Sequence, residues 1–158
     1  MKKLAVTACF LGFTLMAPAQ AQVTVTEAWI RATVGQAKTG GAFMRLTSDQ
    51  DARLLEVRSS VAGSIQIHQM EMDGQMMKMH AVSSLELPAG KTIDLAAGGY
   101  HLMLLDLKQQ LKQGDSVPMT LIVQNKNKKM LEIEIEVPVK ALGYVKQPDA
   151  MRHDGTLK

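Results

Sequence analysis

The segment from Ile65 to Val82 constrains the fold of this chain most strongly, because it has the pattern of two strands joined by a tight turn. Its residues, I-Q-I-H-Q-M-E-M-D-G-Q-M-M-K-M-H-A-V, alternate on either side of Asp73-Gly74. Asp-Gly favours a two-residue type I′ turn, because glycine adopts positive φ without strain. This turn sets the predicted cross-strand pairs, which are Met72 with Gln75, Met70 with Met77, and His68 with Met79.

The same hairpin is predicted to gather histidine and methionine on one face. Side chains alternate along a strand, so every second residue points to the same side. The residues predicted to share this face are Gln66, His68, Met70, Met72, Met77 and Met79. Directly opposite side chains have Cβ atoms roughly 4.5–5.5 Å apart. An imidazole and a thioether therefore lie within the span of one metal ion.

The rest of the chain also has the pattern of short strands. β-branched or alternating runs are separated by turn residues, and the last run has one apolar and one acidic face, as in antiparallel sheets. The predicted strands outside the hairpin are Val23–Arg31, Thr39–Thr47, Ala52–Ser59, Lys91–Leu95, Tyr100–Leu107, Pro118–Val123 and Met130–Val139. The segment Leu105–Leu111 could form a helical turn, which Gly114 would soon end. Eight or nine strands without a convincing helix predict a single all-β domain, an antiparallel sandwich or barrel.

The first residues have the features of an export signal. Positive charge precedes an apolar run from Leu4 to Met16, and Ala19-Gln20-Ala21 matches an A-x-A cleavage site. We expect a signal peptide over residues 1–21 and a mature chain that begins at Gln22. The apolar run is too short to cross a bilayer, which takes about 20 residues. Val6-Thr7-Ala8-Cys9 also resembles a lipoprotein cleavage box, although few apolar residues precede Cys9.

Removal of this segment would also remove the single cysteine, Cys9, and with it any disulfide or thiolate ligand. The formal net charge of the whole chain is +3, and Lys2 and Lys3 contribute to it. The remaining chain is close to neutral, so nothing indicates a nucleic-acid surface. We expect a domain over residues 22–139 and a flexible tail over residues 140–158.

A second pair of candidate ligands lies at His101 and Met103. Residues two apart on a strand point to the same side, so these two side chains project together. Both pairs give a candidate set of two imidazoles and two thioethers: His68, Met79, His101 and Met103. Thioether is a soft, neutral donor that favours Cu(I) over Zn²⁺. The ordinary alternative is that the methionines fill the core and the histidines form hydrogen bonds.

The spacing of these residues resembles the periplasmic copper(I) chaperones called PCuAC. Ten residues separate His68 from Met79, twenty-one separate Met79 from His101, and one separates His101 from Met103. This is similar to the family pattern H-(M)-x10-M-x21-H-x-M. The family resemblance extends to three further motifs, L-P-A-G, G-G-Y-H-L-M-L-L-D-L-K and G-D-x-V-P. Gln69 stands where the family has an optional methionine, so we expect Met70 to be an auxiliary ligand at most.

The resemblance implies a cupredoxin-like β-sandwich that binds Cu(I) through His68, Met79, His101 and Met103. It further implies a periplasmic protein that holds copper and passes it on toward the CuA centre of cytochrome c oxidase, often alongside a Sco-type thiol protein. We infer that the transfer is a ligand exchange and that the protein is not an enzyme. We expect a monomer. Met151 and His153 in the tail are candidates for a second copper ion.

Three other functions remain open on the sequence. The first is a copper buffer for tolerance, which needs the same ligands as a delivery protein. The second is a small copper oxidase or dismutase, although the methionine content argues against a site that must hold Cu(II). The third is a metal-free adhesive sandwich whose methionines contact apolar peptide.

Overall fold

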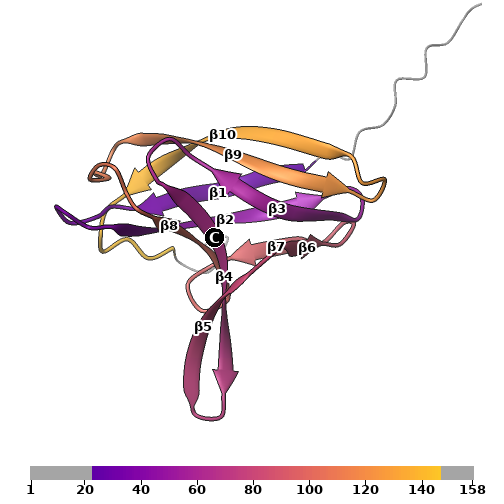
Figure 1. Ribbon diagram of the computed structural model, residues 1–158, viewed down its shortest axis with the longest axis horizontal. Helices are drawn as coiled ribbons and strands as arrows, with labels where there is room; N and C mark the ends of the chain where they lie inside the picture. Colours follow the sequence, from indigo (N-terminus) through magenta and orange to yellow (C-terminus); the bar gives the residue numbers. More distant parts are fainter. Residues whose placement is uncertain (1–22, 147–158) are drawn as a thin grey trace, which may run out of the picture.

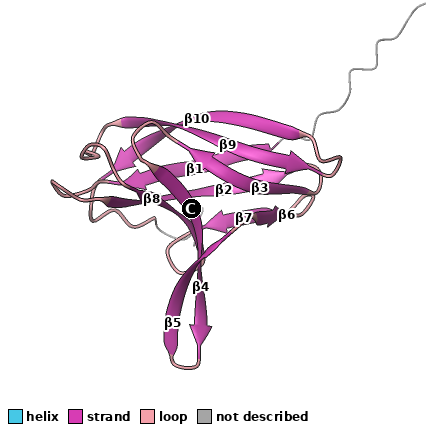
Figure 2. Cartoon of the chain, viewed as in Figure 1, coloured by secondary structure: helices cyan, strands magenta, loops and turns pink. Residues whose placement is uncertain are grey.

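The computed structural model describes residues 23–146, which form ten β-strands and no helix. Figures 1 and 2 show the strands as one layered body from which a single hairpin projects. The strands are β1 (Val23–Arg31), β2 (Thr39–Ser48), β3 (Ala52–Arg58), β4 (Ser64–Asp73), β5 (Met76–Val82), β6 (Leu85–Leu87), β7 (Thr92–Leu95), β8 (Tyr100–Leu105), β9 (Ser116–Asn125) and β10 (Met130–Lys140). The all-β, single-domain prediction is confirmed. The helical turn near residues 105–111 is absent from the described chain, and the sequence did not predict β6.

The strands form one continuous sheet that folds back on itself. Its order is β5-β4-β8-β7-β2-β1-β10-β9-β3-β6, with further pairings of β4 with β3 and of β8 with β2. Most pairs are antiparallel, while β1 with β10 and β7 with β8 are parallel. The β3–β4 pairing, at Val57 and Ile65, brings the two sides of the sheet together. The hairpin β4–β5 therefore starts inside the closed body and ends outside it (Figure 1).

Apolar residues from the inner faces of the strands fill the body. Its largest fully buried side chains include Ile30, Met44, Leu54, Leu102 and Leu121. On β8, Leu102 and Leu104 point into this core, so His101 and Met103 point to the opposite, outer face. The sequence alternation of β8 therefore separates the core from the candidate ligands.

The hairpin register differs from the prediction. Asp73 pairs with Met76, so Gly74 and Gln75 form the two-residue turn instead of Asp73 and Gly74. Gly74 has a φ of 65°, whereas Gln75 does not adopt a positive φ. Glycine at the first turn position fits type II′ better than the predicted type I′. The predicted opposite pairs are therefore wrong; the observed pairs are Met72 with Met77, Met70 with Met79, and His68 with Ala81.

The shared face survives this correction. Moving the turn by one residue moves each partner by two residues, and residues two apart point to the same side. Met77 and Met79 therefore still project on the face that carries His68 and Met70. Only their distances along the hairpin change, because His68 has the small Ala81 directly opposite instead of Met79.

An irregularity in β1 turns an aromatic side chain toward the outer face. The register with β2 shifts between Thr26 and Trp29, and Glu27 has a φ of 52°. The extra residue reverses the alternation, as β-bulges do. Ile30 consequently enters the core opposite Ala42, while Trp29 lies opposite Phe43 on the outer side.

Residues 141–146, which the sequence analysis assigned to the tail, lie against this outer side. The ring of Tyr144 contacts that of Trp29 edge-on, with centroids 4.8 Å apart, and Lys146 forms an ion pair with Glu27. The predicted signal peptide and the candidates Met151 and His153 lie outside the described residues. Within residues 23–146, no helix is long and apolar enough to cross a membrane.

Candidate metal centre

The two candidate histidines lie side by side on neighbouring strands. β4 and β8 pair with His68 directly opposite His101, although 33 positions separate them in the chain. Their ring centroids are 5.7 Å apart, with an interplanar angle of 70°. The sequence predicted that each histidine sits near a methionine, and the fold adds that the histidines are neighbours of each other.

Both imidazoles keep a nitrogen without a protein partner. The Nδ1 atoms of His68 and His101 are buried and make no hydrogen bond within the described residues. Buried polar atoms normally have a partner, because an unpaired one loses its solvation without compensation. Two adjacent, unpaired imidazole nitrogens are the arrangement that a shared metal ion would satisfy.

Gln66 orients the first imidazole. The Nε2 atom of His68 lies 2.9 Å from Gln66 Oε1, and with the carboxamide oxygen as acceptor the Nε2–H donates. The proton then resides on Nε2 and leaves the Nδ1 lone pair free. Metal-binding histidines commonly use their second nitrogen in this way, which fixes both the tautomer and the ring orientation. Gln66 was predicted to lie on this face, but its hydrogen bond to His68 was not predicted.

The surroundings also favour a neutral His68. Burial lowers the pKa of His68, and the neighbouring imidazoles of His101 and His80 lower it further. A metal ligand must be deprotonated, so this shift keeps the lone pair available at a lower pH than for a free imidazole. His80 itself pairs with Gln69 on the opposite face of the hairpin and does not join the pair.

The two predicted methionine ligands approach the histidines from different sides. Met103 follows His101 on the same face of β8 and is half-buried between Gln66 and Gly41. Gly41 has no side chain, and a Cβ there would come within 3.2 Å of the Phe43 ring. Met79 lies on β5, two residues nearer the turn than Ala81, and is 47% exposed. Diagonal neighbours lie about 7–8 Å apart, within reach of a long methionine side chain.

The thioethers beside the histidines are the further candidate donors at this place. Among residues 23–146, no three His, Cys, Asp or Glu side chains come together as a metal-binding group. The two histidines supply two donors, the Gln66 oxygen is already hydrogen-bonded to His68, and the other candidate donors on this face are the methionine sulfurs. Two neutral nitrogens with thioether sulfur suit a soft monovalent ion. Met70 lies opposite Met79 and is half-buried, in a position to assist.

An aromatic row borders the histidines on the side away from the hairpin. The Phe43 ring lies 6.5 Å from His101 and stacks at 4.4 Å on Trp29. The Arg31 guanidinium carbon lies 5.5 Å from the centre of the Phe43 ring, and Arg31 Nε is buried without a hydrogen-bond partner. This row could not be predicted from local sequence patterns, because the pairing of β2 with β8 joins segments about sixty residues apart.

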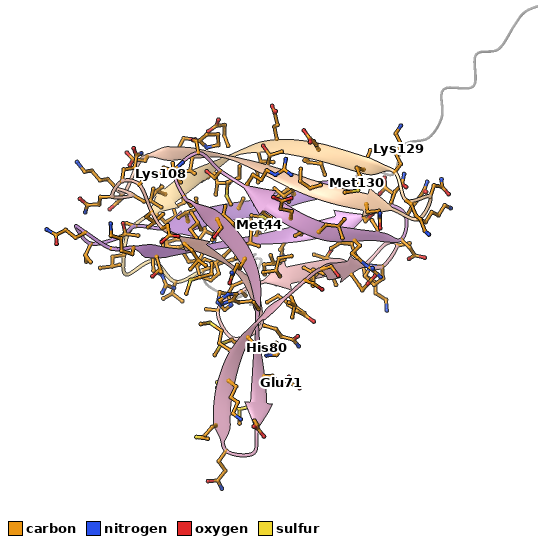
Figure 3. The ribbon with its side chains drawn as sticks, in the orientation of Figure 1. Met44, Glu71, His80, Lys108, Lys129 and Met130 are labelled. Carbon is orange, nitrogen blue, oxygen red and sulfur yellow. The ribbon has the colours of Figure 1, made fainter. Side chains whose placement is uncertain are left out.

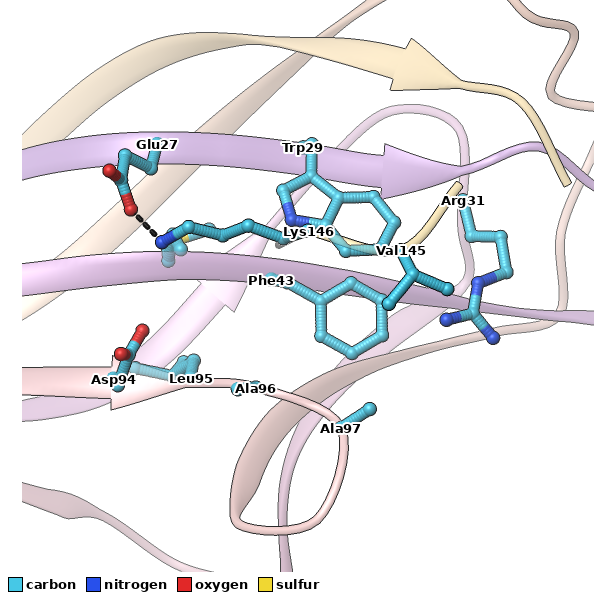
Figure 4. A pocket seen from close by; sticks show the side chains of 11 residues that line it. Glu27, Trp29, Arg31, Phe43, Asp94, Leu95, Ala96, Ala97, Val145 and Lys146 are labelled. Atoms are coloured by element: carbon cyan, nitrogen blue, oxygen red, sulfur yellow. Dashed lines mark hydrogen bonds and ion pairs between the residues drawn. The ribbon is translucent and has the colours of Figure 1, made fainter. Parts of the chain in front are cut away.

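A cavity of about 120 Å³ lies along this aromatic row (Figure 4). Trp29, Phe43 and Arg31 line it together with the ion-paired Glu27 and Lys146. None of the four predicted ligands lines the cavity. The candidate metal centre is therefore a surface arrangement at the base of the hairpin, and the aromatic cavity is its neighbour.

Comparisons with known proteins agree with this architecture. The family model LpqE-like, described as "Putative lipoprotein LpqE-like", matches residues 23–139. A protein of Leifsonia xyli subsp. xyli (strain CTCB07), named as a "Putative lipoprotein", is 34% identical over 128 residues, covering 73% of this chain and 77% of the relative. A protein of Rickettsia prowazekii (strain Madrid E) is 29% identical over 124 residues, covering 75% of this chain and 68% of the relative.

Solved structures with the same fold include copper proteins. The Cu(I) form of DR1885 from Deinococcus radiodurans is 31% identical, with a TM-score of 0.58, covering 80% of this chain and 85% of that chain. The apo PCuAC domain from PmoF1 is 26% identical, with a TM-score of 0.61, covering 75% and 93%. The copper-bound PCuAC domain from PmoF2, at 24% identity and a TM-score of 0.61 over 75% and 92%, supports the fold alone. This chain belongs to the LpqE-like family and has the fold of the PCuAC copper-binding domains.

Proposed function

We propose that this protein is an exported copper chaperone that binds one Cu(I) ion at His68, His101, Met103 and Met79. The observation that carries the proposal is the pair of buried, unpartnered Nδ1 atoms on adjacent histidines, with thioethers on the same face. The names of the similar structures, which include a Cu(I) form and PCuAC domains, support the choice of metal. Copper is the cargo here.

Ligand exchange is the mechanism that this donor set favours. The two histidines are held by strand pairing, and His68 is also held by Gln66. Met79 lies on the projecting hairpin and is the most exposed of the four. Thioethers bind more weakly than imidazoles, so a partner's ligands displace Met79 first. The ion changes neither charge nor oxidation state in this step, which distinguishes the chaperone from a copper oxidase or dismutase.

Copper K-edge absorption on anaerobically Cu(I)-loaded protein tests the site. We expect a mixed nitrogen and sulfur shell at one equivalent in the wild type and loss of stoichiometric binding in His68→Ala. His80→Ala is the matched control, because His80 is on the same hairpin but on its other face. Met103→Leu should weaken Cu(I) binding by about tenfold or more without unfolding the domain. A shell without sulfur, or unchanged affinity in Met103→Leu, would contradict the assignment of thioether ligands.

We further propose the CuA subunit of cytochrome c oxidase as the recipient, with a Sco-type thiol protein as a second assembly protein. The support is the family resemblance of the motif His68, Met79, His101 and Met103. Copper content of the apo CuA domain, re-isolated after mixing with the loaded protein, measures delivery. Transfer to this domain but not to an unrelated apo copper protein is expected. Copper that stays on the donor would favour the buffering alternative.

The periplasm is the proposed location, by way of the signal peptide over residues 1–21. The relatives' description as lipoproteins gives weight to the alternative in which Cys9 is lipidated. Mass spectrometry of the protein from its native envelope distinguishes a mature chain starting at Gln22 from a lipid-modified Cys9.

A further inference from the structure

The projecting half of the hairpin carries methionines that the proposed copper site leaves unexplained. Met72 and Met77 lie directly opposite each other, and they are the next pair on the same face beyond Met70 and Met79. They are 60% and 54% exposed, so they fill no core. Figure 1 shows that this end of β4 and β5 extends away from the sandwich, with no other strand beside it. Packing therefore does not account for the choice of methionine here.

The two faces of the hairpin differ sharply in chemistry. One face carries Glu71 opposite Lys78, and Lys78 forms an ion pair with Asp73. Figure 3 shows Glu71 and His80, both from this face, on the projecting hairpin. By strand alternation, the other face has no charged residue from position 68 to position 81. The side chains on that face are His68, Met70, Met72, Met77, Met79 and Ala81.

We propose that Met70, Met72 and Met77 form a second, weaker site for a soft monovalent cation, at which Cu(I) binds before it reaches the histidines. Directly opposite side chains such as Met72 and Met77 have Cβ atoms about 4.5–5.5 Å apart, and their flexible thioethers can converge on one ion. Met70 supplies the third sulfur from the next position on the same face. Neutral thioether donors select Cu(I) or Ag(I) over divalent ions.

The position of this site gives it a direction of transfer. The outer site is nearer the exposed turn than the histidine pair is. Met70 of the outer site lies directly opposite Met79, a proposed ligand of the inner site, so the two sites adjoin at this pair. Copper can pass from the outer sulfurs to Met79 and then to His68 by exchanging one ligand at a time. Each exchange replaces one neutral donor by another, so no electron or proton has to move. The direction of this transfer rests on the proposed function, whereas binding at the outer sulfurs does not.

Silver titration of the full mature chain, followed by NMR of ¹³C-labelled methionine methyl groups, tests the site. Ag(I) is a soft monovalent probe without redox chemistry. We expect the first equivalent to shift Met79 and Met103 and the second to shift Met72 and Met77. The double variant Met72→Leu, Met77→Leu should weaken the second binding event by about tenfold or more and leave the first nearly unchanged.

Met76→Leu is the matched control. Met76 is in the same hairpin and is 66% exposed, but it pairs with Asp73 on the charged face. Met130→Leu adds a control on the sandwich body, away from the hairpin (Figure 3). Leucine keeps the apolar surface and removes only the sulfur, so docking of an apolar partner would survive the double variant.

The outcomes separate this proposal from the proposed function. The second site is overturned if Met72 and Met77 do not shift, if the double variant keeps its second equivalent, or if Met76→Leu has an equal effect. Failure of the first equivalent alone, with the outer shifts intact, would instead overturn the histidine site. Slower uptake of Cu(I) by the double variant is expected if the outer site is the entry point, and an unchanged rate would overturn that role.

Discussion

The two halves of β4 have the same alternating pattern and opposite surroundings. Near its start, the strand lies between β8 and β3, and Ile67 is only 4% exposed. Its pairing with β8 ends at Gln69. The next residue, Met70, donates a backbone hydrogen bond of 3.1 Å from its N–H to the Gly99 carbonyl. Beyond that point β5 is its strand partner among the described residues. The same alternation thus produces a core strand in one half and a two-sided exposed ribbon in the other.

This difference shows where the methionines of the chain fill space and where they present sulfur. Met44 and Met119 are almost fully buried in the sandwich and act as apolar side chains. The hairpin methionines are on a ribbon with no core beneath it. Exposure, and not residue type, therefore separates the two uses of methionine. His68 lies at the boundary, where the strand leaves the body.

The largest expected effect comes from the inner half. Ile67→Ala removes a buried side chain next to β8 and should lower the free energy of unfolding by about 2–5 kcal/mol. Met72→Ala in the outer half should change it by less than about 0.5 kcal/mol, because no packing is lost. Urea denaturation of both variants measures the difference. Equal losses would mean that the hairpin methionines contribute to a core after all.

An intermediate effect is expected at the turn. Gly74 has a φ of 65°, and an alanine there would cost about 1–2 kcal/mol, since a side chain disfavours this conformation. We expect the cost to fall on the hairpin, because beyond Gln69 β4 pairs with β5 and no longer with β8, so few contacts hold this part to the body. Hydrogen exchange of β5 amides should therefore accelerate by about 5–30-fold in Gly74→Ala. Gly35→Ala is the matched control, because nothing lies within 4 Å of a Cβ there and its φ is not positive. Similar rates in both variants would contradict a hairpin held by its turn.

The smallest effect concerns the boundary residue and pH. Burial, and then the charges of His101 and His80, lower the pKa of His68. The unfolded chain, with a histidine pKa of about 6.5, therefore takes up a proton more readily than the fold does. The stability contributed by neutral His68 is fully present above that pH. It is lost as the pH falls below it, toward the lowered pKa of the folded state. Urea midpoints at pH 7.5 and 5.5 should differ more for wild type than for His68→Gln, whereas His80→Gln should reduce the difference only slightly, because His80 is the smallest of the three causes that lower the pKa of His68. Identical pH dependence in all three proteins would contradict the view that the fold disfavours the protonated form of His68.

Much of the fold was predictable from local pattern. The alternating runs identified nearly all strands, because a half-buried strand needs an apolar residue at every second position. β1 was predicted with its observed bounds. β6 was missed, because Leu85–Leu87 is too short to show an alternation. The bulge at Glu27, which redirects Trp29, could not be predicted, because no turn dipeptide or glycine accompanies it in the sequence.

The alternation along the hairpin strands is sufficient to assign their side chains to one face or the other. His68, Met70, Met77 and Met79 keep the same side whichever of the two turns forms, because the side-chain period of a strand is two. Which of them are neighbours depends on how the strands pair in the folded domain. The pairing of His68 with His101, the aromatic row at Phe43 and the exposure of the hairpin all depend on contacts between distant segments. Local alternation carries no information about such contacts, since they are chosen by the packing of the whole sandwich.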